Sequence, residues 1–83
     1  NLPRDFDRAV RVLLSESGRP LLQEIHRSLK ADNQYLFYHG IGVNLEIDRL
    51  LHQHGIEWSP AQLERFRLPA LRLALQRLQP HST

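Results

Sequence analysis

Apolar residues in the N-terminal third of the chain recur at intervals of three and four, which is the spacing of one buried face of an α-helix. The first set comprises Phe6, Ala9, Val10 and Leu13, and the second comprises Leu21, Leu22, Ile25 and Leu29. Pro3 and Pro20 suit the first turn of a helix, where a missing backbone N–H costs nothing, and Gly18 separates the two sets. The pattern predicts one helix over about 3–16 and a second from Pro20 to about Lys30.

The next stretch, residues 31–42, contains a short aromatic run at positions 35–38. Such a run is typical both of a buried strand and of one or two helical turns, and its length does not separate the two. A single strand without a partner would leave its backbone N–H and C=O groups unpaired. We therefore favour a short helix from Asn33 to Gly40, with a bend at Gly40 and Gly42.

A further helix is expected after this bend. Asn44 is a suitable N-cap for it, because its side-chain oxygen can accept a hydrogen bond from a free N–H of the first turn. The residues that share the buried side of this helix are Val43, Ile47, Leu50, Leu51 and His54. We interpret His54 as a histidine at the edge of the core with a satisfied hydrogen bond.

The stretch after residue 54 contains the signals that end one helix and start another. Gly55 is placed as a C-cap glycine, Ser59 as an N-cap, and Pro60 at the first helical position. Gln62 completes a Ser-x-x-Gln capping box, in which each of the two side chains accepts a hydrogen bond from the other residue's backbone N–H. These residues predict a tight, well-defined connection.

Trp58 precedes this cap, and Leu63 lies where the second half of a hydrophobic staple is expected. The conspicuous residues here are therefore explained by the reversal of the chain between two helices. A DNA-binding helix-turn-helix is a poorer interpretation, because its turn usually has three or four residues and the turn here is longer.

The last helical region, about 60–79, is strongly amphipathic. One side carries Leu63, Phe66, Ala70, Leu73, Ala74 and Leu78, and the other carries Arg65, Arg72 and Gln76. Pro69 lies within it and removes one backbone hydrogen bond. The sequence leaves two alternatives, a helix kinked at an outward-facing proline or two helices over 60–67 and 69–79.

Together these elements predict an all-α fold, a compact bundle of four to five short helices with short connections. A chain of 83 residues has room for one core, so we expect a single helical domain over 1–79, with 80–83 as a tail or the start of a linker. Because the chain begins at Asn1 and contains no methionine, we expect it to be a segment of a larger protein.

The absence of cysteine excludes disulfides, thiolate catalysis and cysteine-ligated zinc. No apolar run approaches the roughly 20 residues of a membrane-spanning helix, and no stretch resembles a signal peptide. We expect a soluble, intracellular protein that does not bind membranes, in a compartment that the sequence does not identify.

The histidines and carboxylates do not form a recognisable site. His52 and His54 are two residues apart, so on a helix they point in different directions. Asp48 and His52 have the i, i+4 spacing, which we interpret as an exposed acid–imidazole pair rather than a metal site. No nucleophile motif or phosphate-binding glycine loop is present. We expect no metal, no cofactor and no enzymatic activity, although the chain can be a non-catalytic domain of a larger enzyme.

The basic residues are mainly arginines, and they concentrate towards the end of the chain. The net charge is only +2, yet residues 59–83 carry four arginines and a single acidic residue. These arginines are Arg65, Arg67, Arg72 and Arg77. Arginine forks match phosphate geometry, so one hypothesis is a nucleic-acid-binding accessory domain in which these four residues contact phosphates.

Four leucines fall outside the main apolar faces, namely Leu14, Leu45, Leu68 and Leu75. They either fill a wider core or form an exposed contact surface. The function we favour from sequence is a non-catalytic helical interaction or docking module that binds a protein partner, a neighbouring domain or a second copy. The residues expected to contact the partner are Leu68, Leu75, Arg65, Arg72, Tyr35 and Tyr38.

Overall fold

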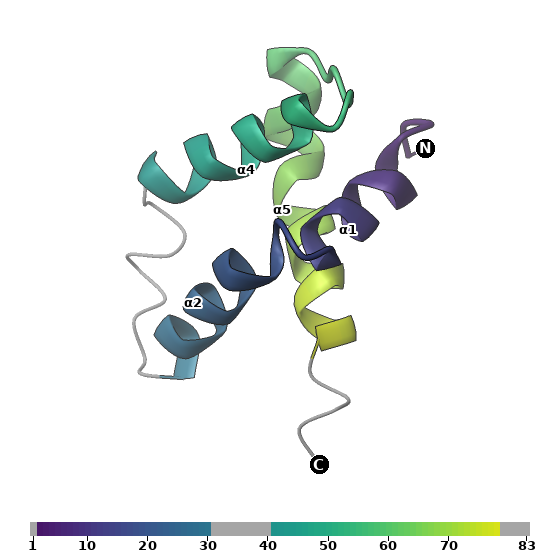
Figure 1. Cartoon of the computed structure of the whole chain (residues 1–83). Helices are drawn as coiled ribbons and strands as arrows, with labels where there is room; N and C mark the ends of the chain where they lie inside the picture. Colours follow the sequence, from purple (N-terminus) through teal and green to yellow (C-terminus); the bar gives the residue numbers. More distant parts are fainter. Residues whose placement is uncertain (1, 31–40, 79–83) are drawn as a thin grey trace.

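The computed structural model describes residues 2–30 and 41–78. These residues form helices and no strand (Figure 1). The helices are α1 (Phe6–Leu14), α2 (Arg19–Lys30), α4 (Ile41–Gln53) and α5 (Pro60–Leu78). The prediction of an all-helical bundle is therefore confirmed. The expected helix over 33–40 and the aromatic run with Tyr35 and Tyr38 lie outside the described residues.

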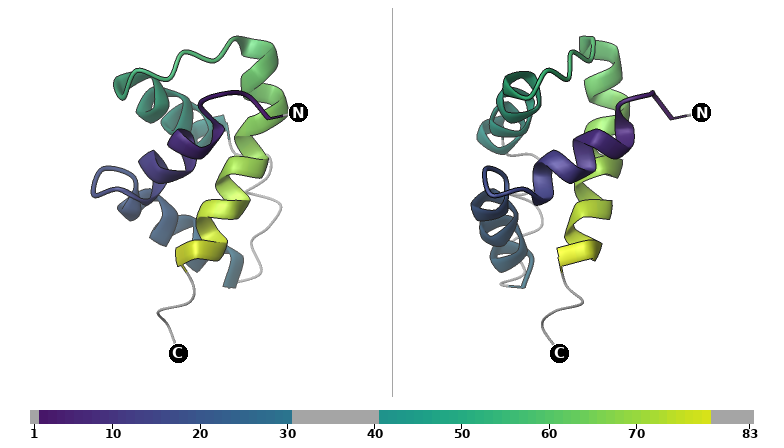
Figure 2. Two further views of the ribbon diagram at one scale, coloured as in Figure 1. Left: turned by 90° about the vertical axis from the view of Figure 1, so that its right-hand side faces the viewer. Right: turned by 45° about the vertical axis from the view of Figure 1, so that its right-hand side comes forward.

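Helices α1 and α5 form the centre of the fold, because each of them packs against the other three described helices. The most extensive association is between α1 and α5, and the right-hand view of Figure 2 shows α1 crossing in front of α5. Buried apolar side chains from these four helices and from the turn before α5 form one core. Within the described ranges, no helix combines the length and the apolar character needed to cross a membrane.

Helix α1 is shorter at both ends than the sequence predicts. Pro3 is not its first helical residue, because the Pro3 carbonyl accepts a hydrogen bond from the Phe6 N–H (3.0 Å) in a turn that precedes the helix. The helix ends at Leu14, since Ser15 is extended (ψ 174°) and its hydroxyl donates to the Val12 carbonyl at 2.6 Å. These local hydrogen bonds compete with the helix ends.

Gly18 allows the chain to pass close to the end of α1. A Cβ atom at this position would lie 2.5 Å from the carbonyl oxygen of Leu13, which is inside van der Waals contact. Only glycine therefore fits here without a shift of the backbone. Helix α2 follows directly, and it buries Leu22 and Ile25 as the sequence predicts.

The expected start of α4 is wrong. The helix begins at Ile41, so Gly42 lies inside it rather than at a bend, and Asn44 is helical rather than an N-cap. A glycine inside a helix costs about 1 kcal/mol relative to alanine, which tertiary packing routinely outweighs. Here α4 buries Ile47 and Leu51, so the predicted inner face of the helix is correct.

The end of α4 agrees with the prediction. Gly55 has a positive φ of 81°, which side chains rarely tolerate. Its N–H donates to the His52 carbonyl (3.0 Å), and the N–H of Ile56 donates to the Leu51 carbonyl (3.0 Å). This pair of bonds is a Schellman motif, in which the buried Ile56 and Leu51 supply the accompanying apolar residues.

Helix α5 continues unbroken through Pro69, which is exposed. Of the two alternatives, the single helix with an outward-facing proline is therefore observed. The proline removes a hydrogen bond to the Arg65 carbonyl, on the side of α5 that faces solvent. Solvent can hydrogen-bond to that carbonyl, so the interruption is tolerated.

Helix α5 buries more of its circumference than the single apolar face that the sequence predicts. Leu75 is 7% exposed and Leu71 is 2% exposed, so both are core residues. The placement of Leu75 on a contact surface is therefore wrong. Leu68 and Leu14 are half-buried and pack against the core. The reason is topological, since a helix with neighbours on three sides buries a broader arc than a helix that lies on a surface.

Candidate interaction surface

Arg67 connects α5 to α4 through a bidentate ion pair with Asp48. Its Nε donates to Oδ1 of Asp48 at 2.8 Å, and its Nη2 donates to Oδ2 at 2.6 Å. Both side chains are largely shielded from solvent, with 20% and 25% of their surface exposed. The guanidinium is therefore used within the fold, and the expectation that Arg67 contacts phosphate and that Asp48 pairs with His52 is corrected.

The other arginines of the predicted phosphate-binding set differ in their surroundings. Arg77 lies 4.0 Å from the carboxylate of Asp7, which also pairs with Arg11 (3.6 Å), so it links the end of α5 to α1. Arg72 is exposed and makes a contact of its own. The four arginines therefore do not form one uniform cationic surface.

Arg65 differs from Arg67 and Arg77, because its described contact is with an aromatic ring rather than a carboxylate. The guanidinium carbon lies 5.5 Å from the centre of the Phe66 ring, within the range of a cation–π interaction. Arg65 is also exposed. Its charge is thus held in place over an apolar surface and remains accessible from solvent.

Phe66 connects this exposed arginine to the core. Its ring lies 6.4 Å from that of Phe6 in an edge-on arrangement and 6.1 Å from that of Trp58. These are favourable aromatic distances. Trp58 is buried, and its indole nitrogen has no hydrogen-bond partner in the described part of the molecule. The indole therefore serves packing, as its place in the turn before α5 predicts.

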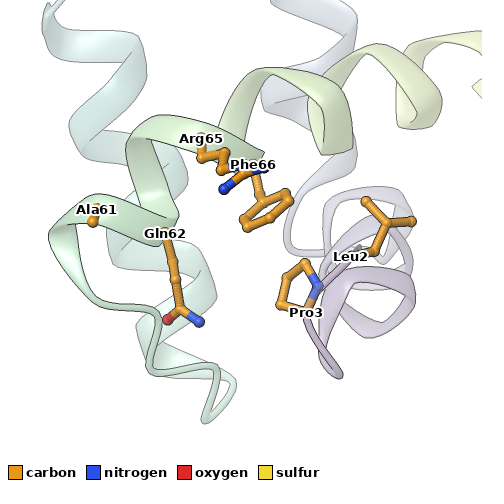
Figure 3. A pocket seen from close by; sticks show the side chains of 6 residues that line it. All are labelled: Leu2, Pro3, Ala61, Gln62, Arg65 and Phe66. Carbon is orange, nitrogen blue, oxygen red and sulfur yellow. The ribbon is translucent and has the colours of Figure 1, made fainter.

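A hollow of about 340 Å³ lies between the segment before α1 and the start of α5 (Figure 3). Its lining residues are Leu2, Pro3, Ala61, Gln62, Arg65 and Phe66. We call it the α5 hollow. Leu2 is 62% exposed, the highest exposure of a large apolar side chain within the described ranges. The hollow is therefore an accessible apolar surface with two polar side chains.

The capping box that starts α5 also fixes the orientation of Gln62. The Ser59 N–H donates to Gln62 Oε1 at 2.9 Å, and the Gln62 N–H donates to Ser59 Oγ at 3.2 Å, which confirms the predicted motif. Because the amide oxygen is engaged by this N–H, the amide nitrogen is at the opposite side. Figure 3 shows the oxygen of Gln62 turned to the loop and the nitrogen turned towards Pro3.

A second hollow, of about 380 Å³, lies where α2 approaches α4. Its lining residues are Ser17, Pro20, Leu21, Glu24 and Glu46. Its ionisable side chains are carboxylates, whereas the ionisable side chain of the α5 hollow is a guanidinium. The two hollows therefore favour ligands of opposite charge. Within the described ranges, no group of three or more metal-ligating side chains lies close enough to share an ion.

The sequence identified part of this surface. Arg65 was among the expected contact residues, but Leu2 and Pro3 were not, and Gln62 and Phe66 were assigned only to structure. Leu2 is in register with the apolar face of the first helix but precedes the predicted start of that helix, so the sequence does not mark it as exposed. The approach of the N-terminal segment to the start of α5 is a long-range contact, which helical periodicity does not reveal.

Comparison of the chain with protein-family models, with curated proteins and with solved structures gives no match. A functional proposal therefore depends on the geometry of the surface itself.

Proposed function

We propose that this domain is a non-catalytic docking module, which binds a peptide segment of a partner protein in the α5 hollow. The observation that carries the proposal is an apolar wall, made of the exposed Leu2 and the half-buried Pro3 and Phe66, beside the accessible guanidinium of Arg65. Apolar surfaces of this kind, rimmed by polar groups, are typical of protein contact sites.

The energetic argument concerns what a partner side chain would gain. Burial of a leucine-sized side chain contributes about 1.5–3 kcal/mol. Phe66 packs against Phe6 and the core, so the part of the wall that α5 contributes is held in place before a partner arrives. A preorganised apolar wall reduces the entropy lost on binding. Arginine beside an aromatic ring is also a frequent combination among the residues that dominate binding energy.

The polar side chains of the α5 hollow favour binding over catalysis. They are an amide, in Gln62, and a guanidinium, in Arg65. Neither group is one of the usual general acids or bases of enzymes, which are mainly histidine, carboxyl, lysine, tyrosine and cysteine side chains. Such a module can equally serve as the non-catalytic part of a larger enzyme.

Nucleic-acid binding is the second hypothesis, with the exposed Arg65 as its principal phosphate contact. It is weaker than the docking proposal because Arg67 is held by Asp48 and Arg77 lies beside Asp7. A titration against short duplex and single-stranded DNA and RNA distinguishes the two. Micromolar binding that weakens steeply with salt would replace the docking proposal with this one.

The docking proposal is tested by selecting binders from a random peptide library displayed on phage. We expect enriched peptides that share an apolar residue and that change the fluorescence of Trp58, the only tryptophan, through its contact with Phe66. Binding is then compared in Leu2→Ser, which alters the hollow, and in Leu45→Ser, which removes an equally large exposed leucine (57%) from α4.

We expect Leu2→Ser to weaken the selected peptides about tenfold, a loss of about 1.4 kcal/mol, and Leu45→Ser to leave them unchanged. Failure to enrich any peptide, or equal losses in the two variants, would remove the proposal. Both leucines are exposed, so neither substitution is expected to affect folding.

A further inference from the structure

We infer that the α5 hollow selects an acidic peptide segment, in which an apolar side chain that fills the hollow is flanked by carboxylates that accept hydrogen bonds from Gln62 and from Arg65. This inference rests on the proposed docking function and specifies the chemistry of the partner.

The first reason is the hydrogen-bonding character of Gln62. An amide side chain can normally rotate to offer either its oxygen or its nitrogen, so it does not select for charge. Here the Ser59 N–H donates a hydrogen bond to Gln62 Oε1 (2.9 Å), which fixes the orientation of the amide group. The group left for a ligand is the NH₂ donor, turned towards Pro3 and the interior of the hollow (Figure 3). A donor in this position favours an acceptor on the partner.

The second reason is the charge of Arg65. Within the described part of the molecule, Arg67 and Arg77 face carboxylates of neighbouring helices. None of the residues that line the α5 hollow is acidic. The guanidinium of Arg65 instead lies over the Phe66 ring, which leaves its N–H groups available at the edge of the apolar wall. Its charge is therefore complementary to a carboxylate of the partner.

The two donors lie at different ends of the hollow. Gln62 and Arg65 are three residues apart on α5, and Figure 3 shows the Gln62 amide turned towards the loop end of the hollow and the Arg65 guanidinium beside Phe66. Carboxylates on either side of an apolar residue can therefore accept from one donor each, and such charge-assisted bonds are about twice as strong as neutral ones. The apolar wall then takes the neighbouring side chain of the same segment.

The inference is tested with short synthetic peptides that are blocked at both ends, so that only side chains carry charge. They have the same glycine–serine background and differ in the central sequence, which is Glu-Leu-Glu, Gln-Leu-Gln or Lys-Leu-Lys. Titration is followed by ¹⁵N NMR spectra of the whole chain. We expect Glu-Leu-Glu to shift the signals of Ala61, Gln62 and Arg65, and to bind about tenfold more tightly than Gln-Leu-Gln.

The decisive variant is Gln62→Glu. A glutamate at this position of a capping box still accepts the Ser59 N–H, so the start of α5 is preserved, but an oxygen replaces the nitrogen that faces the hollow. We expect binding of Glu-Leu-Glu to fall about tenfold or more, because the ligand then meets a like charge. The matched control is Gln76→Glu, the same substitution at an exposed site near the other end of α5, and it is expected to change binding less than twofold.

Equal affinity for Glu-Leu-Glu and Gln-Leu-Gln at the hollow would overturn the inference and leave the docking function intact. Absence of binding by Glu-Leu-Glu, or signal shifts outside the hollow, would also overturn it, while the library selection decides the docking function independently. Equal losses in Gln62→Glu and Gln76→Glu would show a general effect of charge and would refute the role assigned to Gln62.

Discussion

The two sides of α5 use the same residue type for opposite purposes. Arg67 faces α4 and is held by both oxygens of Asp48, whereas Arg65, two positions earlier, faces solvent beside Phe66. Each residue of an α-helix is rotated by about 100° from the one before it, so two positions are enough to move a side chain from the inner to the outer surface. Arginine content therefore reveals little about function until each guanidinium has been assigned to a side of its helix.

The largest expected difference between the two sides of α5 comes from creating a cavity on its inner side, which lowers the free energy of unfolding. Leu75→Ala removes a side chain that is 7% exposed, and we expect a loss of about 3 kcal/mol in the free energy of unfolding. Urea denaturation measures it, with Leu45→Ala on the exposed surface of α4 as the control. A loss no larger than that of the control would show that Leu75 is not a core residue.

The ion pair on the inner side has the next largest expected effect. Arg67→Ala leaves Asp48 partly buried without its partner, and we expect a loss of about 2 kcal/mol in the free energy of unfolding. Arg65→Ala is the matched control, since it removes the same side chain from the outer surface. If Arg67→Ala and Arg65→Ala destabilise the fold equally, the distinction between the two sides of α5 is wrong.

A smaller effect is expected at the start of the helix. Ser59→Ala deletes the hydroxyl that accepts the Gln62 N–H, and we expect a loss of about 1 kcal/mol in thermal or chemical denaturation. The Ser59 N–H is retained, so the orientation of Gln62 and the binding of an acidic peptide are expected to persist. Loss of peptide binding in a folded Ser59→Ala domain would contradict the expectation that this substitution lowers stability without affecting binding.

The smallest effect on stability is expected for Arg65→Ala itself. An exposed arginine over an aromatic ring contributes about 0.5–1 kcal/mol at most, so the variant should remain folded. Its peptide binding should nevertheless fall about tenfold, as judged by Trp58 fluorescence. Unchanged affinity in Arg65→Ala would move the binding surface away from the α5 hollow.

The parts of the fold that sequence predicted best depend on neighbours in the chain. Between Gly55 and Gln62, each signal acts within five residues of its partner, and the Schellman motif and the capping box both occur as expected. At the start of α4 the local signals, a glycine bend and an asparagine cap, gave the wrong boundary. The helix passes through Gly42 and Asn44, because the burial of residues such as Ile47 outweighs weak local preferences.

The candidate site was less predictable, because its parts come from distant positions. Arg65 was expected on the outer side of the last helix, but the pairing of Arg67 with Asp48 spans two helices and leaves no mark on the periodicity. Burial of Leu75 follows from the number of helices around α5, which a pattern along one helix does not contain. The role proposed for Gln62 could be inferred only once both its capping hydrogen bonds and its position in the α5 hollow were known.

The central position of α5 has a consequence for how the domain is made. Of the described helices, α5 is synthesised last, and its 19 residues require about one to four seconds at the usual 5–20 residues per second. Until α5 has been made, the apolar faces of α1, α2 and α4 lack the helix that packs against all three. A chain that ended before residue 60 would therefore leave part of these faces uncovered after release from the ribosome, because α5 supplies Ala70, Leu71, Ala74 and Leu75 to the shared core.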